Sequence, residues 1–204
     1  MVLEELRRCW DGPLTVKCRL GTESPDWRDV FVQRLRLFEE CGADALVVHP
    51  RFISEKLKRR ARWEEMPWVV SQTRLPVVGN GDIDSVERLD ELRRTLPRVR
   101  GFMLGRVAAV QPWIFAQAGG RPVPSDYAEV WERFLGYVQE DFAPEKVLGR
   151  VKLFTEYFAR NFQFGHELYR GVHSAGSVDE ARDRALAFFA SKPEACRVPS
   201  LAGL

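Results

Sequence analysis

Two short stretches of the sequence combine glycine with groups that suit phosphate. GNGD at residues 79–82 follows a run of apolar residues, and MLGR ends on Gly105 and Arg106. Glycine lets backbone N–H groups approach an anion closely, and a guanidinium grips phosphate oxygens in pairs. The alternative is that both stretches are plain turns from a strand into a helix. Their recurrence at neighbouring strand ends favours a phosphate site.

Lys17 lies in the predicted strand TVKCRL, where side chains alternate between the two faces of a sheet. Lys17 and Arg19 share one face, whereas Val16, Cys18 and Leu20 share the other, more apolar face. A charge on an inner face is costly unless a ligand or a carboxylate pairs with it. We therefore expect Lys17 to be a site residue. Cys18 lies on the wrong face for a catalytic thiol.

A third group of polar residues follows the apolar run ALVV. His49 ends this strand, and Arg51 comes just beyond it. Position alone leaves a site role and a structural role for His49 equally open. The loop that follows carries the basic run KLKRRAR at residues 56–62. Such a run is either solvated surface or a contact for a polyanionic backbone, and both readings stay open.

Apolar strand-like runs alternate with helical patterns over residues 1–118. The predicted strands span residues 14–20, 45–49, 76–80 and 101–106. This alternation predicts an α/β fold with parallel strands joined by right-handed helical crossovers. It corresponds to half of a (β/α)8 TIM barrel, because a complete barrel takes about 250 residues. Either the other half lies upstream in a longer parent chain, or two copies pair to cover the sheet edges.

The rest of the chain has a helical pattern. Residues 119–125 read as a linker, residues 126–192 as a small all-helical domain, and residues 193–204 as a loose tail. Asp126 with Glu129, and Ser177 with Glu180, have the spacing of helix-capping pairs.

Composition limits the function classes further. The chain has 204 residues and a formal net charge of +2, which is too small to indicate a nucleic-acid partner by itself. Its 4 cysteines and 3 histidines show no metal-ligand spacing, so we expect no metal. The sequence has no apolar run of membrane-spanning length and no secretory signal pattern, so we expect a cytoplasmic protein with no membrane partner. The oligomeric state stays open.

Four motifs, TVKCRLG, VVHPR, VVGNGDI and MLGRVAAVQPWIF, occur in an order and spacing that resemble the second half of the tRNA-dihydrouridine synthases. These are flavoproteins with a (β/α)8 barrel and a C-terminal helical domain. The resemblance covers residues 1–118 well and the helical remainder in character only.

The resemblance implies FMN as cofactor, NADPH as reductant and a tRNA uridine as substrate. It implies hydride transfer from the flavin to the uracil ring and protonation by an acidic cysteine. The implied cofactor-binding residues are Lys17, His49, Asn80, Gly81, Asp82, Gly105 and Arg106. The implied tRNA-binding residues are Arg51, Lys56, Lys58, Arg59, Arg60, Arg62, Lys146, Arg150 and Lys152. The target base has to leave the stacked tRNA to reach the flavin.

Two departures from the family pattern affect what we expect. The family shows glycine and threonine around the arginine after the histidine, whereas this sequence reads HPRFISEKLKRRARW. The segments that carry the proton-donating cysteine are missing, so we expect that cysteine upstream, no catalytic residue in this chain, and no synthase activity from the isolated chain. Two alternatives are a non-catalytic tRNA-binding module and another FMN-binding or phosphate-binding barrel enzyme.

Overall fold

The structure is a computed structural model that describes residues 2–55, 59–123 and 126–201. The chain divides into two compact units. The first comprises Met1–Ile83 and Glu87–Gly105, and the second comprises Asp84–Val86 and Arg106–Leu204.

The first unit contains a four-stranded parallel sheet in the order β1-β2-β3-β4. The strands are β1 (Thr15–Gly21), β2 (Ala45–Phe52), β3 (Val77–Asn80) and β4 (Gly101–Met103). All four strands were predicted, and their parallel pairing is confirmed. β2 runs beyond the predicted end at His49, because Gly21 and Phe52 pair after a register shift in β1. β4 ends at Met103, before the predicted end at residue 106.

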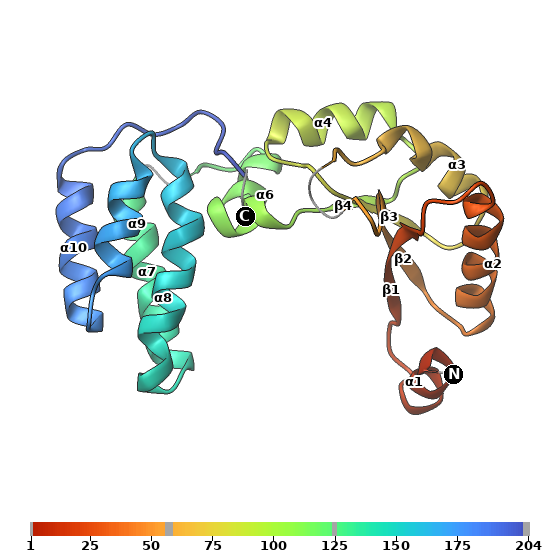
Figure 1. The fold of residues 1–204 in the computed structure, drawn as a ribbon, viewed down its shortest axis with the longest axis horizontal. Helices are drawn as coiled ribbons and strands as arrows, with labels where there is room; N and C mark the ends of the chain where they lie inside the picture. Colours follow the sequence, from red (N-terminus) through yellow and green to blue (C-terminus); the bar gives the residue numbers. More distant parts are fainter. Residues whose placement is uncertain (1, 56–58, 124–125, 202–204) are drawn as a thin grey trace. The chain divides into compact units, whose positions relative to one another are not determined.

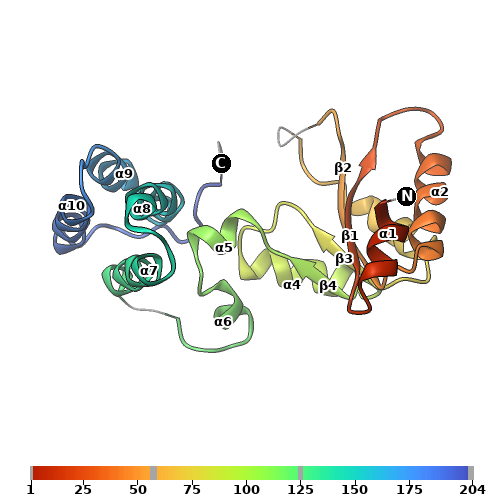
Figure 2. The ribbon, with the colours of Figure 1, turned by 90° about the horizontal axis from the view of Figure 1, so that it is seen from below.

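Helices α1 (Val2–Cys9), α2 (Trp27–Glu40), α3 (Met66–Ser71) and α4 (Val86–Thr95) alternate with these strands, and a short 3-10 helix, η1 (Trp63–Glu65), precedes α3. α2 and α3 lie on the same side of the sheet (Figures 1 and 2). The core on this side includes Phe31, Leu35, Leu46, Val48 and Met66, all fully buried. The apolar stripe of α2 thus packs against the apolar face of the strands.

The opposite face of the sheet is more polar. Thr15 and Lys17 of β1 are exposed, and Met103 of β4 is 37% exposed. The register places Lys17 beside Val47 and Arg19 beside His49, so these side chains share one face. The predicted segregation of Lys17 and Arg19 from the apolar side of β1 is therefore present in the structure.

The second unit contains α5 (Arg106–Val110), α6 (Ile114–Ala118), α7 (Tyr127–Asp141), α8 (Pro144–Phe158), η2 (Ala159–Asn161), α9 (Gly165–His173) and α10 (Val178–Ala190). Figure 2 shows α7, α8, α9 and α10 side by side and nearly end-on. Their shared core includes Trp131, Phe158 and Val172. Both predicted caps are present, since Asp126 accepts from Ala128 and Glu129 N–H and Ser177 accepts from Glu180 N–H.

Asn161 connects α5 to this core. Its buried amide donates to the carbonyls of Val110 and Phe158 and accepts from Gln111. These contacts therefore group α5 with the later helices. The sequence-based boundary after residue 118, between the half-barrel and the helical part, stays a prediction.

None of the helices in the described part of the chain is long and apolar enough to cross a membrane. The same residues contain no cluster of three or more His, Cys, Asp or Glu side chains arranged to hold a metal ion.

Candidate functional site

A buried ion pair connects the ends of β2 and β3. Arg51 Nη2 donates to both carboxylate oxygens of Asp82 at 2.6 Å, and its side chain is 3% exposed. The N–H of Ala61 also donates to Asp82, at 2.6 Å. Burying a guanidinium is tolerable only with such a partner, because desolvation of an unpaired charge costs several kcal/mol.

The backbone after β3 directs this carboxylate. Gly81 has φ 126° and Asp82 has φ 48°, both in the left-handed region. A Cβ on Gly81 would lie 2.8 Å from His49 Cδ2 and 3.0 Å from the Cβ of Ala61, so only glycine fits beside the histidine ring. A non-glycine residue at positive φ is strained and persists where its surroundings hold it. Here Arg51 and Ala61 hold Asp82 in place.

His49 is buried next to this ion pair. Its Nε2 lies 3.0 Å from Arg51 Nη1, which can only donate, so Nε2 accepts and the proton of the neutral ring is on Nδ1. The pKa of His49 is lowered to about 4, mainly by burial and also by the charges of Arg51, Arg19 and Lys17. The nearby Asp82 carboxylate acts in the opposite direction but is outweighed. The imidazole is therefore neutral at physiological pH.

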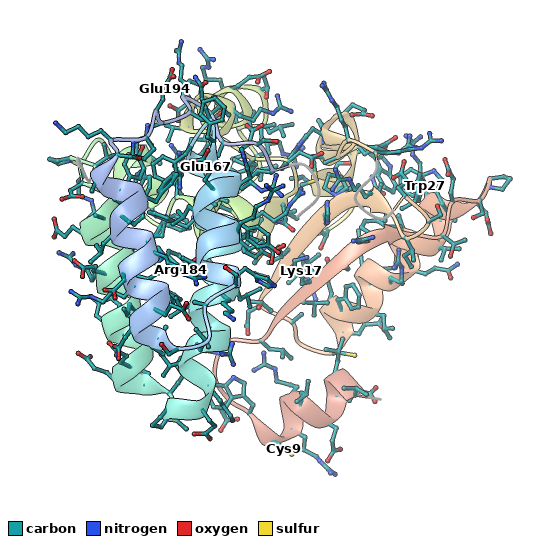
Figure 3. All side chains as sticks on the ribbon, turned by 60° about the vertical axis from the view of Figure 1, so that its left-hand side comes forward. Cys9, Lys17, Trp27, Glu167, Arg184 and Glu194 are labelled. Atoms are coloured by element: carbon teal, nitrogen blue, oxygen red, sulfur yellow. The ribbon has the colours of Figure 1, made fainter. Side chains whose placement is uncertain are left out.

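Lys17 and Arg19 add positive charge to the same face of the sheet. Lys17 is exposed and makes no hydrogen bond or ion pair with any described residue; its place on β1 is labelled in Figure 3. The Nε of Arg51 is buried and has no acceptor among the residues described. An anion, or a group that gains electron density, would be stabilised on this face.

The other predicted cofactor residues lie at or after the ends of β3 and β4. Asn80 Nδ2 donates to the carbonyl of Met103 at 2.8 Å and so ties these strand ends together. A Cβ on Gly105 would meet nothing within 4 Å, so the backbone there is open. Arg106 begins the second unit, where its Nη1 donates to the Leu201 carbonyl at 3.1 Å.

Three of the predicted tRNA-binding side chains are bonded within the protein instead of being free at the surface. Arg51 is buried and held by Asp82, so it does not offer a surface contact. Arg62 pairs with Glu55 at 2.8 Å and covers the Phe52 ring at 5.0 Å. Arg59 and Arg60 are exposed, whereas Lys56 and Lys58 lie outside the described residues. Lys152 on α8 donates its Nζ to the Ala175 carbonyl at 2.7 Å.

Lys146 and Arg150, also on α8, are both exposed and lie one helical turn apart. The Arg150 guanidinium lies 4.8 Å from the centre of the Phe142 ring. These two residues remain available on the surface for an anionic partner.

Glu55 is a residue of the site region that the sequence reasoning missed. Its carboxylate is buried, accepts from Phe52 N–H at 2.8 Å and pairs with Arg62. Burial acts to raise the pKa of Glu55, but the hydrogen bonds from Arg62 and Phe52 outweigh it and the pKa is lowered. The signal was one acidic residue directly before a basic run, which on its own predicts only a surface ion pair.

The sequence matches the dihydrouridine synthase (Dus) family over residues 1–187. The chain belongs to the dihydrouridine synthase family. Among curated relatives, it is 28% identical over 179 residues to the "Probable tRNA-dihydrouridine synthase" of Mycobacterium leprae (strain TN), covering 82% of this chain and 46% of that protein. It is 33% identical over 134 residues to "tRNA-dihydrouridine synthase B" of Shewanella oneidensis (strain ATCC 700550 / JCM 31522 / CIP 106686 / LMG 19005 / NCIMB 14063 / MR-1), covering 63% of this chain and 41% of that protein.

The chain thus spans about half the length of the dihydrouridine synthases it matches, 46% for the Mycobacterium leprae protein. The match includes the strand-end network of β2 and β3, since residues 1–187 cover both strands and the loops after them.

Proposed function

We propose that this chain forms the flavin-binding part of an FMN-dependent tRNA-dihydrouridine synthase, with NADPH as reductant. The observation that carries the proposal is a positively charged strand-end face in a chain of this family. Lys17 and Arg19 supply the charge of that face, beside the neutral His49 and the paired Arg51, and Lys17 has no ion-pair partner among the residues described. The (β/α)8 half-barrel is the architecture that four consecutive parallel strands and their helices fit.

The residues present suit FMN. Lys17 would stabilise negative charge on a reduced flavin, and the Nδ1–H of neutral His49 is a hydrogen-bond donor. Asn80, Gly81 and Gly105 would present backbone N–H groups to a phosphate, with Arg106 as its cation. The carboxylate of Asp82 would not contact the cofactor, because it already accepts hydrogen bonds from Arg51 and Ala61. Asp82 would set the position of Arg51 while its own backbone stays available. When bound, FMN would supply the hydride chemistry.

The substrate we propose is a uridine of tRNA, bound through exposed basic residues. Arg59 and Arg60 follow β2, and Lys146 and Arg150 lie on α8. Lys56 and Lys58 belong to the same proposal. Each of these would contact phosphates without reading sequence. Arg51 would instead act from within the strand-end network, and Arg62 and Lys152 would hold the segments that carry the exposed cations.

We also propose that the proton donor to the substrate lies outside these 204 residues. Cys18 lies on the helix-covered face, and burial raises the pKa of its thiol despite Arg34 and Lys17. Cys41 is buried, Cys9 lies on α1 and Cys196 lies after α10. The isolated chain would therefore bind the cofactor and form no dihydrouridine. A cytoplasmic location accords with a tRNA substrate.

An FMN titration of the purified chain tests this function through quenching of flavin fluorescence. We expect saturable binding that Lys17→Ala weakens at least tenfold. Arg94→Ala is the matched control, because Arg94 is exposed, belongs to the same unit and makes no hydrogen bond or ion pair with a described residue. Equal affinities of the two variants, or no binding by the parent chain, would count against the proposal. Salt-dependent tRNA binding without FMN binding would favour a non-catalytic tRNA-binding module.

A further inference from the structure

None of the proposed flavin-binding or tRNA-binding residues in the described part of the chain lines a pocket in the second unit. Its volume is about 540 Å³, and its walls include Glu156, Arg160, Gln163, His166, Tyr169 and Cys196. These residues come from the end of α8, η2, the start of α9 and the segment after α10. Pockets of this volume accommodate ligands of the size of a nucleotide.

The chain after α10 builds one wall of this pocket. It crosses back over the ends of α9 and α8 (Figure 1). Phe162 pairs with Ala195 in an antiparallel bridge, Gln163 N–H donates to the Glu194 carbonyl at 3.0 Å, and Cys196 N–H donates to the Asn161 carbonyl at 2.7 Å. Figure 3 labels Glu194 and Glu167 at the same end of the helices. The wall is therefore fixed by backbone hydrogen bonds.

The opposite wall is held by a close approach of two backbone segments. A Cβ on Gly165 would lie 1.8 Å from the Ala159 carbonyl oxygen, so η2 and the first turn of α9 are in direct backbone contact. This contact fixes the spacing between Arg160 and His166, because each directly follows one of the two residues in contact. The pocket thus has two walls that are each set by main-chain geometry.

Arg160 brings an unpaired cation to the pocket. It is half-buried and makes no hydrogen bond or ion pair with the residues described. Three arginines of these helices are paired instead: Arg133 with Glu129, Arg182 with Glu132 and Arg184 with Glu180. Glu156, one turn before Arg160, also has no partner among described residues. A free guanidinium can bind an anionic group of a ligand, and a free carboxylate beside it can accept hydrogen bonds from the ligand's donors.

Aromatic and amide groups complete the lining. The Tyr169 ring stacks on His173 with centroids 5.0 Å apart, which holds the tyrosine in one orientation. His166 and Tyr169 offer ring surface on which a nucleobase can stack, and Gln163 offers an amide. Stacking on such rings contributes about 1–3 kcal/mol per base.

We propose that this pocket binds a nucleoside 5′-phosphate, with the phosphate on Arg160, the base against Tyr169 and the ribose hydroxyls near Glu156. The ligand is either a free nucleotide or an unstacked nucleotide of an RNA chain, since both present the same groups. The proposal does not depend on the flavin site of the first unit.

Isothermal titration of the full chain with UMP, and separately with AMP, tests the proposal. We expect saturable binding of at least one nucleotide, at least tenfold weaker in Arg160→Ala. Arg170→Ala is the control, because Arg170 is an exposed arginine of α9 that does not line the pocket; its affinity should stay within twofold of the parent chain. No binding of either nucleotide, or an equal loss in both variants, would overturn the proposal.

Two further arms separate the sources of the ligand and the two sites. Competition by hexauridylate would show that the pocket accepts a nucleotide of an RNA chain, whereas nucleotide binding without competition would restrict it to free nucleotides. Lys17→Ala should leave the nucleotide affinity unchanged, so failure of the flavin site would not mimic failure of the pocket. Nucleotide binding lost in Lys17→Ala and retained in Arg160→Ala would refute the assignment.

Discussion

At the scale of single residues, His49 combines burial with a positive surrounding field, and both lower its pKa. The neutral ring accepts from Arg51 at Nε2 and keeps its proton on Nδ1. A charged imidazole would add a further cation beside Lys17, Arg19 and Arg51, which is unfavourable. The neutral ring instead leaves Lys17 and Arg19 as the source of positive charge.

The lowered pKa of His49 predicts a stability change with pH. The folded-state pKa is about 4 and the ordinary value is 6.5, so the unfolded chain takes up the proton first as pH falls. The contribution is intact above about pH 6.5 and is lost towards pH 4; at about 1.4 kcal/mol per pKa unit it amounts to at most about 3 kcal/mol. Urea unfolding at pH 7.5 and pH 5 measures this loss. His49→Gln should lose less stability between pH 7.5 and pH 5 than the parent chain, whereas a change of the exposed His173, His173→Gln, should lose as much as the parent chain. Equal losses of unfolding free energy in the two variants would contradict the assignment of this pH dependence to His49.

The Arg51–Asp82 ion pair predicts strong coupling. Asp82→Asn leaves a buried guanidinium without its counter-charge, so we expect a loss of about 3 kcal/mol in the free energy of unfolding. Adding Arg51→Met should recover part of that loss, since no buried charge then remains. A double-mutant cycle measured by urea unfolding gives the coupling. Arg93→Ala, which breaks an exposed pair with Asp90, should cost under about 0.5 kcal/mol. Additive effects of the Asp82 and Arg51 changes would rule out the coupling.

At the scale of elements, the sequence predicts the parts that depend on local patterns. The strands, the face of β1 that carries Lys17, and the caps Asp126 and Ser177 each follow from residue types a few positions apart. The pairing of Arg51 with Asp82 spans 31 positions and depends on the positive φ of Asp82. No local pattern specifies that angle, so a basic residue after a strand was expected to be a surface contact.

The same limit applies to the basic loop and the helices. Glu55 and Arg62 are seven residues apart, and the pair also depends on Phe52, whose N–H donates to Glu55 and whose ring lies under Arg62. The pocket at Arg160 requires the segment after α10 to return to η2. From sequence, that segment carried only the features of a loose tail.

Gly165 predicts a clear effect at the junction of η2 and α9. In Gly165→Ala the new Cβ would meet the Ala159 carbonyl oxygen, a backbone atom that cannot swing away, so we expect a loss of at least about 2 kcal/mol. Gly136→Ala in α7 is the control, because a Cβ there meets nothing within 4 Å and alanine favours a helix by about 0.5–1 kcal/mol. Thermal unfolding followed by circular dichroism compares them. A destabilised Gly136→Ala beside an unchanged Gly165→Ala would show that the packing is wrong.

At the scale of the whole molecule, the chain combines a parallel four-stranded sheet with helices and belongs to the dihydrouridine synthase family. The polar face of the sheet, around Lys17 and His49, is where we propose that the flavin binds. Glycines at the ends of β3 and the loop after β4 would admit the phosphate, and the ion pair of Arg51 with Asp82 would keep the strand ends in register.

Amide chemical-shift mapping of the ¹⁵N-labelled chain during FMN addition tests that claim most directly. We predict saturable shifts concentrated at residues 17–19, at His49 and Arg51, and at residues 79–82 and 105, with smaller changes on α2, which lies across the sheet. Loss of these shifts in Lys17→Ala, with the rest of the spectrum retained, would tie binding to this face. Shifts centred on Arg160 and Tyr169, or none at all, would contradict the account.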